Sequence, residues 1–264
     1  MKKTQALFRK LKGNKPKREI IEIKCAGGLG NRLINLICGL ESARISNQEP
    51  IISWPTSSAC RALSSDLFDS SLQIKEEFQN IKIKYSKQHQ IPKDFNITRT
   101  VNHLLKLKPK REIIDKVSGF VNQYNIDSNV MGLHIRKTDS SEEVDLNFWI
   151  NTILSNPSKR YFVCSDSEAE ENKFKYFPNV IVHPKQEYVR KKWRDKPWIY
   201  SNDKGYKNVV RSEESVIEAL HDLLILSHTN IQDTNKYSTF LQLAKYYSSI
   251  IKDIMVSIHD IFYN

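Results

Sequence analysis

The residues best suited to chemistry in this sequence form one motif, His134-Ile135-Arg136-Lys137-Thr138-Asp139. The motif ends an apolar run that predicts a strand over residues 130–135. An arginine can form paired hydrogen bonds with phosphate oxygens, and an adjacent lysine adds a point charge. Open α/β sheets bind ligands at the carboxyl ends of their strands, so the motif is suited to a diphosphate. Strand ends also carry charge simply because they meet solvent, and the motif alone does not decide between these interpretations.

A glycine-rich turn, Gly27-Gly28-Leu29-Gly30-Asn31-Arg32-Leu33, is the second candidate for anion binding. Apolar patterning predicts a strand before it, residues 20–25, and a helix after it, residues 33–43. Such a turn directs free backbone N–H groups and the positive end of a helix dipole at one point. It lacks the Gly-Lys-Ser/Thr of a P-loop, and Leu33 stands where a dinucleotide fingerprint has its third glycine. A tight turn that only permits close packing is the alternative.

Polar residues also follow or interrupt three other apolar segments. Asp166 comes directly after the predicted strand 161–164, between two serines that we expect to cap the next helix. Asp222 interrupts the apolar helix predicted over residues 213–227, and a buried acid needs a cation or hydrogen-bond donors nearby. Ser238 and Thr239 precede a closing helix, residues 240–254, and offer hydroxyl and N–H groups to an anion.

Strands and helices that alternate along the chain must position these residues. We predict further strands at 50–54, 81–85, 180–182 and 231, and further helices at 60–68, 111–124, 146–154 and 167–174. This order predicts parallel sheets with βαβ connections. Because the pattern starts near residue 20 and again near residue 130, we expect two Rossmann-like domains facing each other across a cleft. We assign residues 19–126 to the first domain and 127–264 to the second.

The net charge of +11 is concentrated at the start of the chain, because residues 1–18 carry +8 and contain no acid. We expect this segment to be a flexible basic arm. It contains Leu7, Phe8 and Leu11, which allow weak adsorption to an anionic membrane surface; a solubilising tail is the alternative. The rest of the chain carries only +3, so a nucleic-acid partner is not expected.

The four cysteines, Cys25, Cys38, Cys60 and Cys164, lack the spacing of metal ligands and are expected to be small buried thiols. The sequence also has no Asp-X-Asp triplet, a pattern that could hold a divalent ion. It also has no apolar signal-peptide core and no run long enough to span a bilayer. These features predict a cytoplasmic protein, and a peripheral membrane contact through the arm is one of the two alternatives for that segment.

Taken together, the motifs resemble the GT-B fucosyltransferase superfamily, which includes α1,6-fucosyltransferases, nodulation fucosyltransferases and protein O-fucosyltransferases. The resemblance covers nearly the whole chain from residue 20 and rests on residues 27–33, 134–139, 162–166, 219–227 and 238–240, in that order. It implies an α/β fold of the GT-B type, in which the first domain is on the acceptor side and the second binds the nucleotide sugar. It further implies a GDP-fucose donor, inversion at the transferred sugar carbon, and no metal. The sequence does not identify the acceptor, and a cytoplasmic setting favours a glycan over a protein.

The resemblance also implies roles for single residues. Arg136 looks like the arginine that neutralises the β-phosphate, and we take it as the catalytic residue. The expected donor-binding residues are Gly30, Asn31, His134, Lys137, Asp166, Asp222, Ser238 and Thr239, with Asp139 and Arg211 as further candidates. Among these, Asn31 looks like the asparagine that reaches across the cleft toward the diphosphate. The chain departs from the family at Lys137, where a second arginine is frequent, and the chain is short for the family.

Two other functions remain open at this point. A non-catalytic α/β protein that binds polyanions or nucleic acid would explain the basic arm and the basic, aromatic segment 185–206. A GT-B enzyme that uses a different nucleotide sugar is the second alternative. Segment 185–206 could equally form a lid over the donor or a solvated loop.

Overall fold

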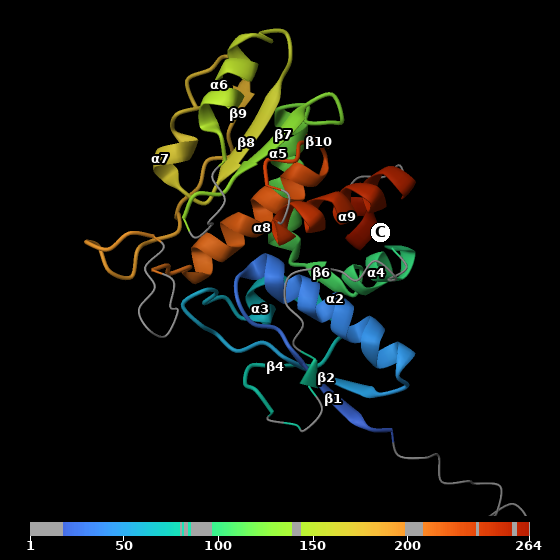
Figure 1. The fold of residues 1–264 in the computed structure, drawn as a ribbon. Coiled ribbons are helices and arrows are strands. Elements are labelled where there is room, and N and C mark those ends of the chain that lie inside the picture. Colours follow the sequence, from blue (N-terminus) through green and yellow to red (C-terminus); the bar gives the residue numbers. More distant parts are fainter. Residues whose placement is uncertain are drawn as a thin grey trace, which may run out of the picture.

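Two parallel sheets of four strands each make up the framework of the protein (Figure 1). The computed structural model describes residues 18–79, 81, 84–85, 97–138, 144–198, 208–235, 238–254 and 258–263. The first sheet contains β1 (Ile20–Lys24), β2 (Glu49–Ser53), β4 (Ile74–Lys75) and β5 (Lys84–Tyr85). The second contains β7 (Met131–Ile135), β8 (Tyr161–Ser165), β9 (Val180–Ile181) and β10 (Asn230–Ile231).

Both sheets have the same strand order. The first runs β4-β2-β1-β5 and the second β9-β8-β7-β10, so each reads third, second, first, fourth in chain order. In each sheet the direction of winding therefore reverses between the first strand and the fourth. Ligands bind in open α/β sheets at such a reversal, beyond the carboxyl ends of the strands. The glycine-rich turn follows β1, and Arg136 directly follows β7, so both anion-binding candidates stand at these two points.

Helices and a short antiparallel strand pair cover the sheets. The helices are α2 (Leu29–Ile45), α3 (Ser64–Leu67), α4 (Ile97–Leu104), α5 (Arg111–Gln123), α6 (Leu146–Leu154), α7 (Glu168–Glu171), α8 (Glu213–Ser227), α9 (Thr239–Ile254) and α10 (Ile258–Tyr263). The antiparallel pair is β3 (Phe68–Ser70) with β6 (Leu107–Pro109).

One hydrophobic core extends from the first sheet into the second. It contains Ile23 of β1, Leu33 of α2, Leu223 of α8 and Phe162 of β8, all fully buried. The closing helix α9 packs against both α2 and α8, and Figure 1 shows α8 and α9 between the two sheets. A second cluster, which includes Val163 and Phe174, lies on the other side of the second sheet. The apolar faces of α2, α8 and α9 therefore join the two halves.

A buried carboxylate ties the strands of the first sheet together. Glu22, in the middle of β1, is fully buried. Its carboxylate accepts hydrogen bonds from the Ser53 hydroxyl (2.8 Å) and from the backbone N–H groups of Gln79 (2.6 Å) and Ile81 (3.3 Å). Burial alone would raise the pKa of Glu22, but these donors outweigh burial and lower it. The charge therefore holds β2 and the segment before β5 against β1.

Two of the expected helices are much shorter in the structure. In the expected helix 60–68, only α3 is helical, because the Ala62 carbonyl accepts the Trp54 indole N–H (3.2 Å) and the chain is held extended there. In the expected helix 167–174, only α7 is helical. Turns with hydrogen bonds between residues three apart follow it and bring Phe174 into the core. The sequence analysis also missed β3, β4, β6, α4 and α10, of which all but α4 are six residues or shorter.

A buried arginine fixes the shape of the glycine-rich turn. Gly27 adopts a φ of +86°, which favours glycine, and the Arg32 Nε–H donates to its carbonyl (2.8 Å). The Nη2 group of Arg32 also donates to the Pro55 carbonyl (2.8 Å) and to the Ser57 hydroxyl (3.3 Å). The guanidinium carbon lies 5.1 Å from the centre of the Trp54 ring. Arg32 therefore connects the turn after β1 with the loop after β2.

Replacing Arg32 by methionine is expected to destabilise the protein, because two partly buried carbonyl groups lose a charged donor. We expect the free energy of unfolding to fall by about 2–4 kcal/mol, measured by urea denaturation. The free energy of unfolding of Arg32→Lys should lie between those of Arg32→Met and the wild type, since a lysine ammonium keeps the charge but lacks the planar guanidinium with its several N–H donors. The matched control is Arg111→Met, whose exposed pair with Asp115 (3.8 Å) should contribute less than about 1 kcal/mol. Equal effects of both methionine variants would contradict this role.

Candidate active site

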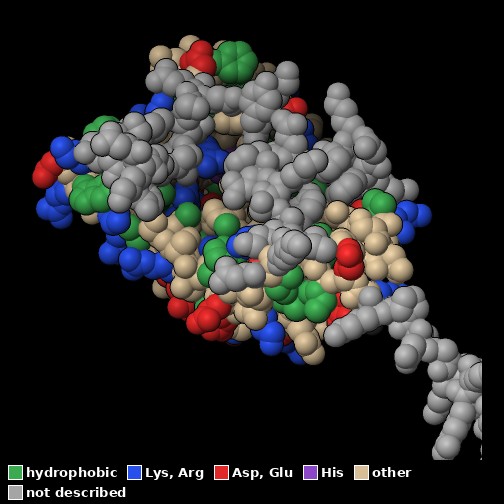
Figure 2. All heavy atoms as spheres, turned by 60° about the horizontal axis from the view of Figure 1, so that its bottom comes forward, with side chains coloured by type: hydrophobic (Ala, Val, Ile, Leu, Met, Phe, Trp, Pro, Cys, Tyr) green, Lys and Arg blue, Asp and Glu red, His purple; other side chains and the backbone are tan. Residues whose placement is uncertain are grey.

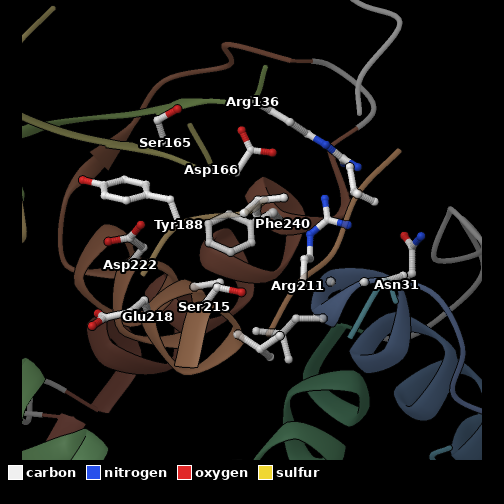
Figure 3. A pocket seen from close by; sticks show the side chains of 18 of the residues that line it. Asn31, Arg136, Ser165, Asp166, Tyr188, Arg211, Ser215, Glu218, Asp222 and Phe240 are labelled. Carbon is white, nitrogen blue, oxygen red and sulfur yellow. The ribbon is translucent and has the colours of Figure 1, made fainter. Parts of the chain in front are cut away.

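A cavity of about 540 Å³ lies where the carboxyl ends of the two sheets meet, and residues from both halves line it. Of the residues singled out from the sequence, those that line it are Gly30, Asn31, His134, Arg136, Asp166, Arg211, Asp222 and Thr239. Figure 3 shows Arg136, Arg211 and Asn31 at one end of this cavity, and Asp222 and Glu218 toward the opposite end. The cavity therefore has a cationic end and an acidic end.

The N-termini of three helices border the cavity. Gly28 to Asn31 begin α2, Ser215 and Val216 lie in the first turn of α8, and Thr239 and Phe240 begin α9. The start of α8 already carries two acids and a capping bond from the Ser215 N–H to the Ser212 hydroxyl. The start of α2 has no acid in its first turn, and no side chain caps it. Its N–H groups and its dipole therefore suit an anion in the cavity.

Gly30 permits the close approach of α9 to α2. A Cβ at Gly30 would lie 2.8 Å from the Thr239 hydroxyl and 3.2 Å from the Phe240 nitrogen. Beside it, the Thr239 hydroxyl donates to the Asn31 side-chain carbonyl (3.0 Å). This bond occupies the oxygen of the Asn31 amide and leaves its NH₂ group to donate elsewhere. Two residues expected to bind the donor from opposite domains therefore bind each other.

The end of β8 positions the segment that carries Arg136. The Asp166 carboxylate accepts the Lys137 backbone N–H (2.9 Å) and a very short hydrogen bond from the Thr138 hydroxyl. Thr138 is fully buried. Asp166 thus fixes the chain directly after Arg136, and its carboxylate is already occupied. The hydroxyl of Thr138 was missed in the sequence as a positioning group, because only the tertiary structure brings β8 beside it.

Arg211 is held in place by the first half of the chain. Its backbone N–H donates to the Ser58 carbonyl (2.9 Å), and its carbonyl accepts the Arg61 N–H (3.1 Å). In Figure 3 the Arg211 and Arg136 side chains both extend into the same end of the cavity. Arg136, directly after β7, and Arg211, just before α8, therefore both lie at the cationic end of the cavity.

His134 is neutral at physiological pH. It is buried and stacks on the Phe240 ring, with the ring centres 4.4 Å apart and the planes inclined by 23°. Burial lowers the pKa of His134 to about 4, and Arg136 contributes in the same direction. An uncharged imidazole beside an aromatic ring gives this wall of the cavity an apolar, flat surface.

The buried Asp222 has the cation that the sequence analysis required, which confirms that expectation. The Lys185 ammonium lies 3.0 Å from the Asp222 carboxylate and also pairs with Glu171. Burial would lower the pKa of Lys185, but the two carboxylates outweigh burial and raise it. Burial raises the pKa of Asp222, yet Lys185 and His183 lower it overall. Asp222 and Lys185 are therefore both charged at neutral pH.

Some expected site residues do not reach the cavity. The Ser238 hydroxyl accepts the Leu241 N–H (3.2 Å) as a helix cap, and neither Ser238 nor Lys137 is among the lining residues described. Asp139 and the arm before Arg18 lie outside the described residues. Segment 185–206 is described as far as residue 198; Lys185, Glu187, Tyr188 and Val189 line the cavity, whereas Lys191 lies over Trp198. The four cysteines are buried free thiols, as expected.

Comparisons with known proteins agree on the fold. No family model and no curated protein matches the sequence. Among solved structures, the fucosyltransferase NodZ from Bradyrhizobium superposes with a TM-score of 0.61 at 14% identity, over 87% of this chain and 92% of that chain. NodZ α-1,6-fucosyltransferase soaked with GDP-fucose gives a TM-score of 0.56 at 14% identity, over 88% and 93%. A variant of FUT1 from Arabidopsis thaliana, in complex with GDP, gives 0.51 at 12% identity, over 94% and 72%.

In the described part of the chain, none of the helices combines the length and the apolar character that crossing a membrane requires. The two parallel sheets, their common strand order and the superpositions confirm the fold class expected from the sequence. The chain has the GT-B, fucosyltransferase-like fold, with its cavity between the carboxyl ends of two Rossmann-like sheets.

Proposed function

We propose that this protein is an inverting, metal-independent glycosyltransferase that transfers fucose from GDP-fucose to a glycan. The observation that carries the proposal is the cavity, in which Arg136, Arg211 and the uncapped start of α2 surround one end. The fold supports it, because the solved structures that resemble this chain are fucosyltransferases, one of them soaked with GDP-fucose. A cavity of about 540 Å³ is also large enough for a small-molecule ligand.

The charges suggest how the donor lies. Its diphosphate occupies the cationic end, where Arg136 and Arg211 pair with its oxygens and the N–H groups of α2 add neutral donors. Its guanine points toward Asp222, whose Oδ1 is buried and has no hydrogen-bond partner among the described residues. A carboxylate can accept both the ring N–H and the amino group of guanine. The flat wall formed by His134 and Phe240 lies between these two ends.

The proposed reaction builds negative charge on the leaving group. The acceptor hydroxyl attacks the sugar carbon from the face opposite the diphosphate and forms the new C–O bond. The bond from that carbon to the β-phosphate oxygen breaks, and its electron pair leaves with GDP. Arg136 stabilises this developing charge, and Asp166 keeps the segment after Arg136 in place. The hydroxyl proton passes to a base, for which Asp139 remains a candidate.

The two halves have different roles in this proposal. Residues 127–264 bind the nucleotide sugar, and residues 19–126 are on the acceptor side. Residues 1–18 form a basic arm that adsorbs weakly to anionic membranes, and the enzyme works in the cytoplasm. On the face shown in Figure 2, both acidic and basic side chains lie on the described surface. This mixture supports a small-molecule donor rather than a nucleic-acid partner.

Calorimetry with GDP, UDP and ADP tests the donor class. We expect GDP to bind about 10- to 100-fold more tightly than UDP or ADP, since each lacks a hydrogen bond to the buried carboxylate. Tighter binding of UDP or ADP would indicate a different nucleotide sugar. Salt-sensitive binding of RNA or DNA that survives deletion of residues 1–18, without GDP binding, would favour the polyanion-binding alternative.

Arg136→Ala is expected to lower the turnover of GDP-fucose by about 10²–10³-fold, because the leaving phosphate loses its principal cation. The fold should remain intact, as judged by circular dichroism and the thermal midpoint. Arg136→Lys should recover part of the turnover, since it restores the charge without the paired geometry. The control, Arg111→Ala, removes an exposed arginine outside the cavity. Near-normal turnover of Arg136→Ala would contradict the assignment.

A short incubation with EDTA is expected to leave the initial rate of transfer unchanged, because fixed cations and helix N-termini stabilise the diphosphate. An ion that bridged the diphosphate would exchange readily, and EDTA would remove it. The measurement is the initial rate of GDP release with and without the chelator. A loss of rate that Mn²⁺ restores would overturn metal independence.

A further inference from the structure

Three metal-ligating side chains meet beside the acidic end of the cavity. His183 follows β9, and Glu218 and His221 lie one turn apart on α8. Each offers one ligand atom, and these atoms all lie within 4.8 Å of one another. The side chains are 10%, 4% and 1% exposed, respectively, so the cluster is almost fully withdrawn from solvent.

A hydrogen bond joins His221 Nδ1 to the Glu218 Oε2 (3.2 Å), but no hydrogen bond of the described residues accounts for His183. His183 Nδ1 lies 3.7 Å from the Glu218 Oε2 and 3.7 Å from Asp222, and it is buried without a hydrogen-bond partner. The Glu218 Oε1 accepts the Gln186 N–H (3.1 Å), which turns Oε2 toward the two imidazoles. The Phe120 ring packs edge-on against His183, with the ring centres 5.0 Å apart, and limits how its imidazole can turn.

The charge around the cluster is unbalanced. Glu218 and Asp222 are both buried beside His183, and Lys185 pairs with Asp222 and with Glu171, whose pKa is raised to about 7 by burial. Buried carboxylates are costly unless cations or donors compensate them. Glu218 is not paired with Lys185, and its Oε2 faces His183 and His221. A further positive charge between the two imidazoles and this oxygen would balance the group.

We propose that His183, Glu218 and His221 bind a divalent transition-metal ion, with Zn²⁺ as the preferred occupant. Two imidazole nitrogens and one carboxylate oxygen are a donor set that zinc favours. Ligand atoms of a tetrahedral zinc site lie about 3.4 Å apart, as follows from its bond lengths. Two of the three separations, 3.2 Å from Glu218 to His221 and 3.7 Å from Glu218 to His183, bracket that value, and the two histidine ligand atoms lie within 4.8 Å of each other. A water molecule completes the coordination.

The ion would stabilise one wall of the cavity and take no part in sugar transfer. It joins α8 to the segment after β9, which also carries Lys185 and Tyr188. Of the three proposed ligands, Glu218 is labelled in Figure 3, and it lies away from Arg136 and Arg211, the cations expected to hold the diphosphate. A buried ion exchanges slowly, so this site is compatible with a transfer rate that a short EDTA incubation leaves unchanged.

The test measures metal in the full chain, expressed without a polyhistidine tag and without any donor present. We expect elemental analysis after dialysis to find about one zinc ion per chain. The chelated protein should bind Co²⁺ with the visible absorption of a four-coordinate site. Free Zn²⁺ about 100-fold above its Kd should raise the thermal midpoint by roughly 5–10 °C.

His183→Gln and His221→Gln should each lose the bound zinc and the cobalt spectrum. His228→Gln, which changes the histidine at the C-terminus of the same helix, should keep both. Wild-type protein that binds no more Zn²⁺ than a variant carrying both His183→Gln and His221→Gln would overturn the proposal. If the variants fail to fold, the zinc content and cobalt spectrum of the wild type decide. Neither readout depends on GDP binding or on transfer.

Discussion

The starts of α2 and α9 meet where Gly30 lies against Thr239, and the position of the cavity depends on this contact. A helix that closes the second half of the chain thereby packs on the first helix of the first half, and one core forms across both. Any side chain at Gly30 would push the Thr239 hydroxyl and the Phe240 backbone away. The start of α2 lies at the carboxyl end of β1, and α9 packs on α8 of the second half. The contact between α2 and α9 therefore brings the carboxyl ends of both sheets to the same cavity.

Burial of charge organises the rest of the site. Glu22 fixes the strands of the first sheet, Arg32 fixes the turn that follows, and Asp166 fixes the segment after Arg136. Each forms hydrogen bonds with backbone groups as well as with side chains, so removing one would leave several polar groups unpaired. The same principle separates the ends of the cavity. Arginines lie where an anion can bind, whereas at the other end Lys185 compensates only in part for the charge of the carboxylates around it.

This separation relates the proposed chemistry to the proposed metal site. A leaving diphosphate needs cations that are in place before the reaction, and Arg136 and Arg211 come from segments held by backbone hydrogen bonds. The histidine-rich end needs a cation for the opposite reason, because carboxylates are buried there. The protein thus provides fixed cations at the end of the cavity where the substrate is expected. At the other end it provides imidazole and carboxylate ligands for the proposed structural ion.

The sequence by itself determined the elements with strong periodicity and the motifs that follow them. Local patterns predicted the strand before Gly27 and the helices over residues 111–124 and 213–227, and they placed Arg136 at the end of a strand. Asp222 was expected to have a partner, because an acid within an apolar helix must be compensated. Only the tertiary structure decided that the partner is Lys185, that Asn31 binds Thr239, and that His183 meets Glu218 and His221. These pairs join residues from different elements, and local sequence patterns carry no information about which distant side chains share a buried space.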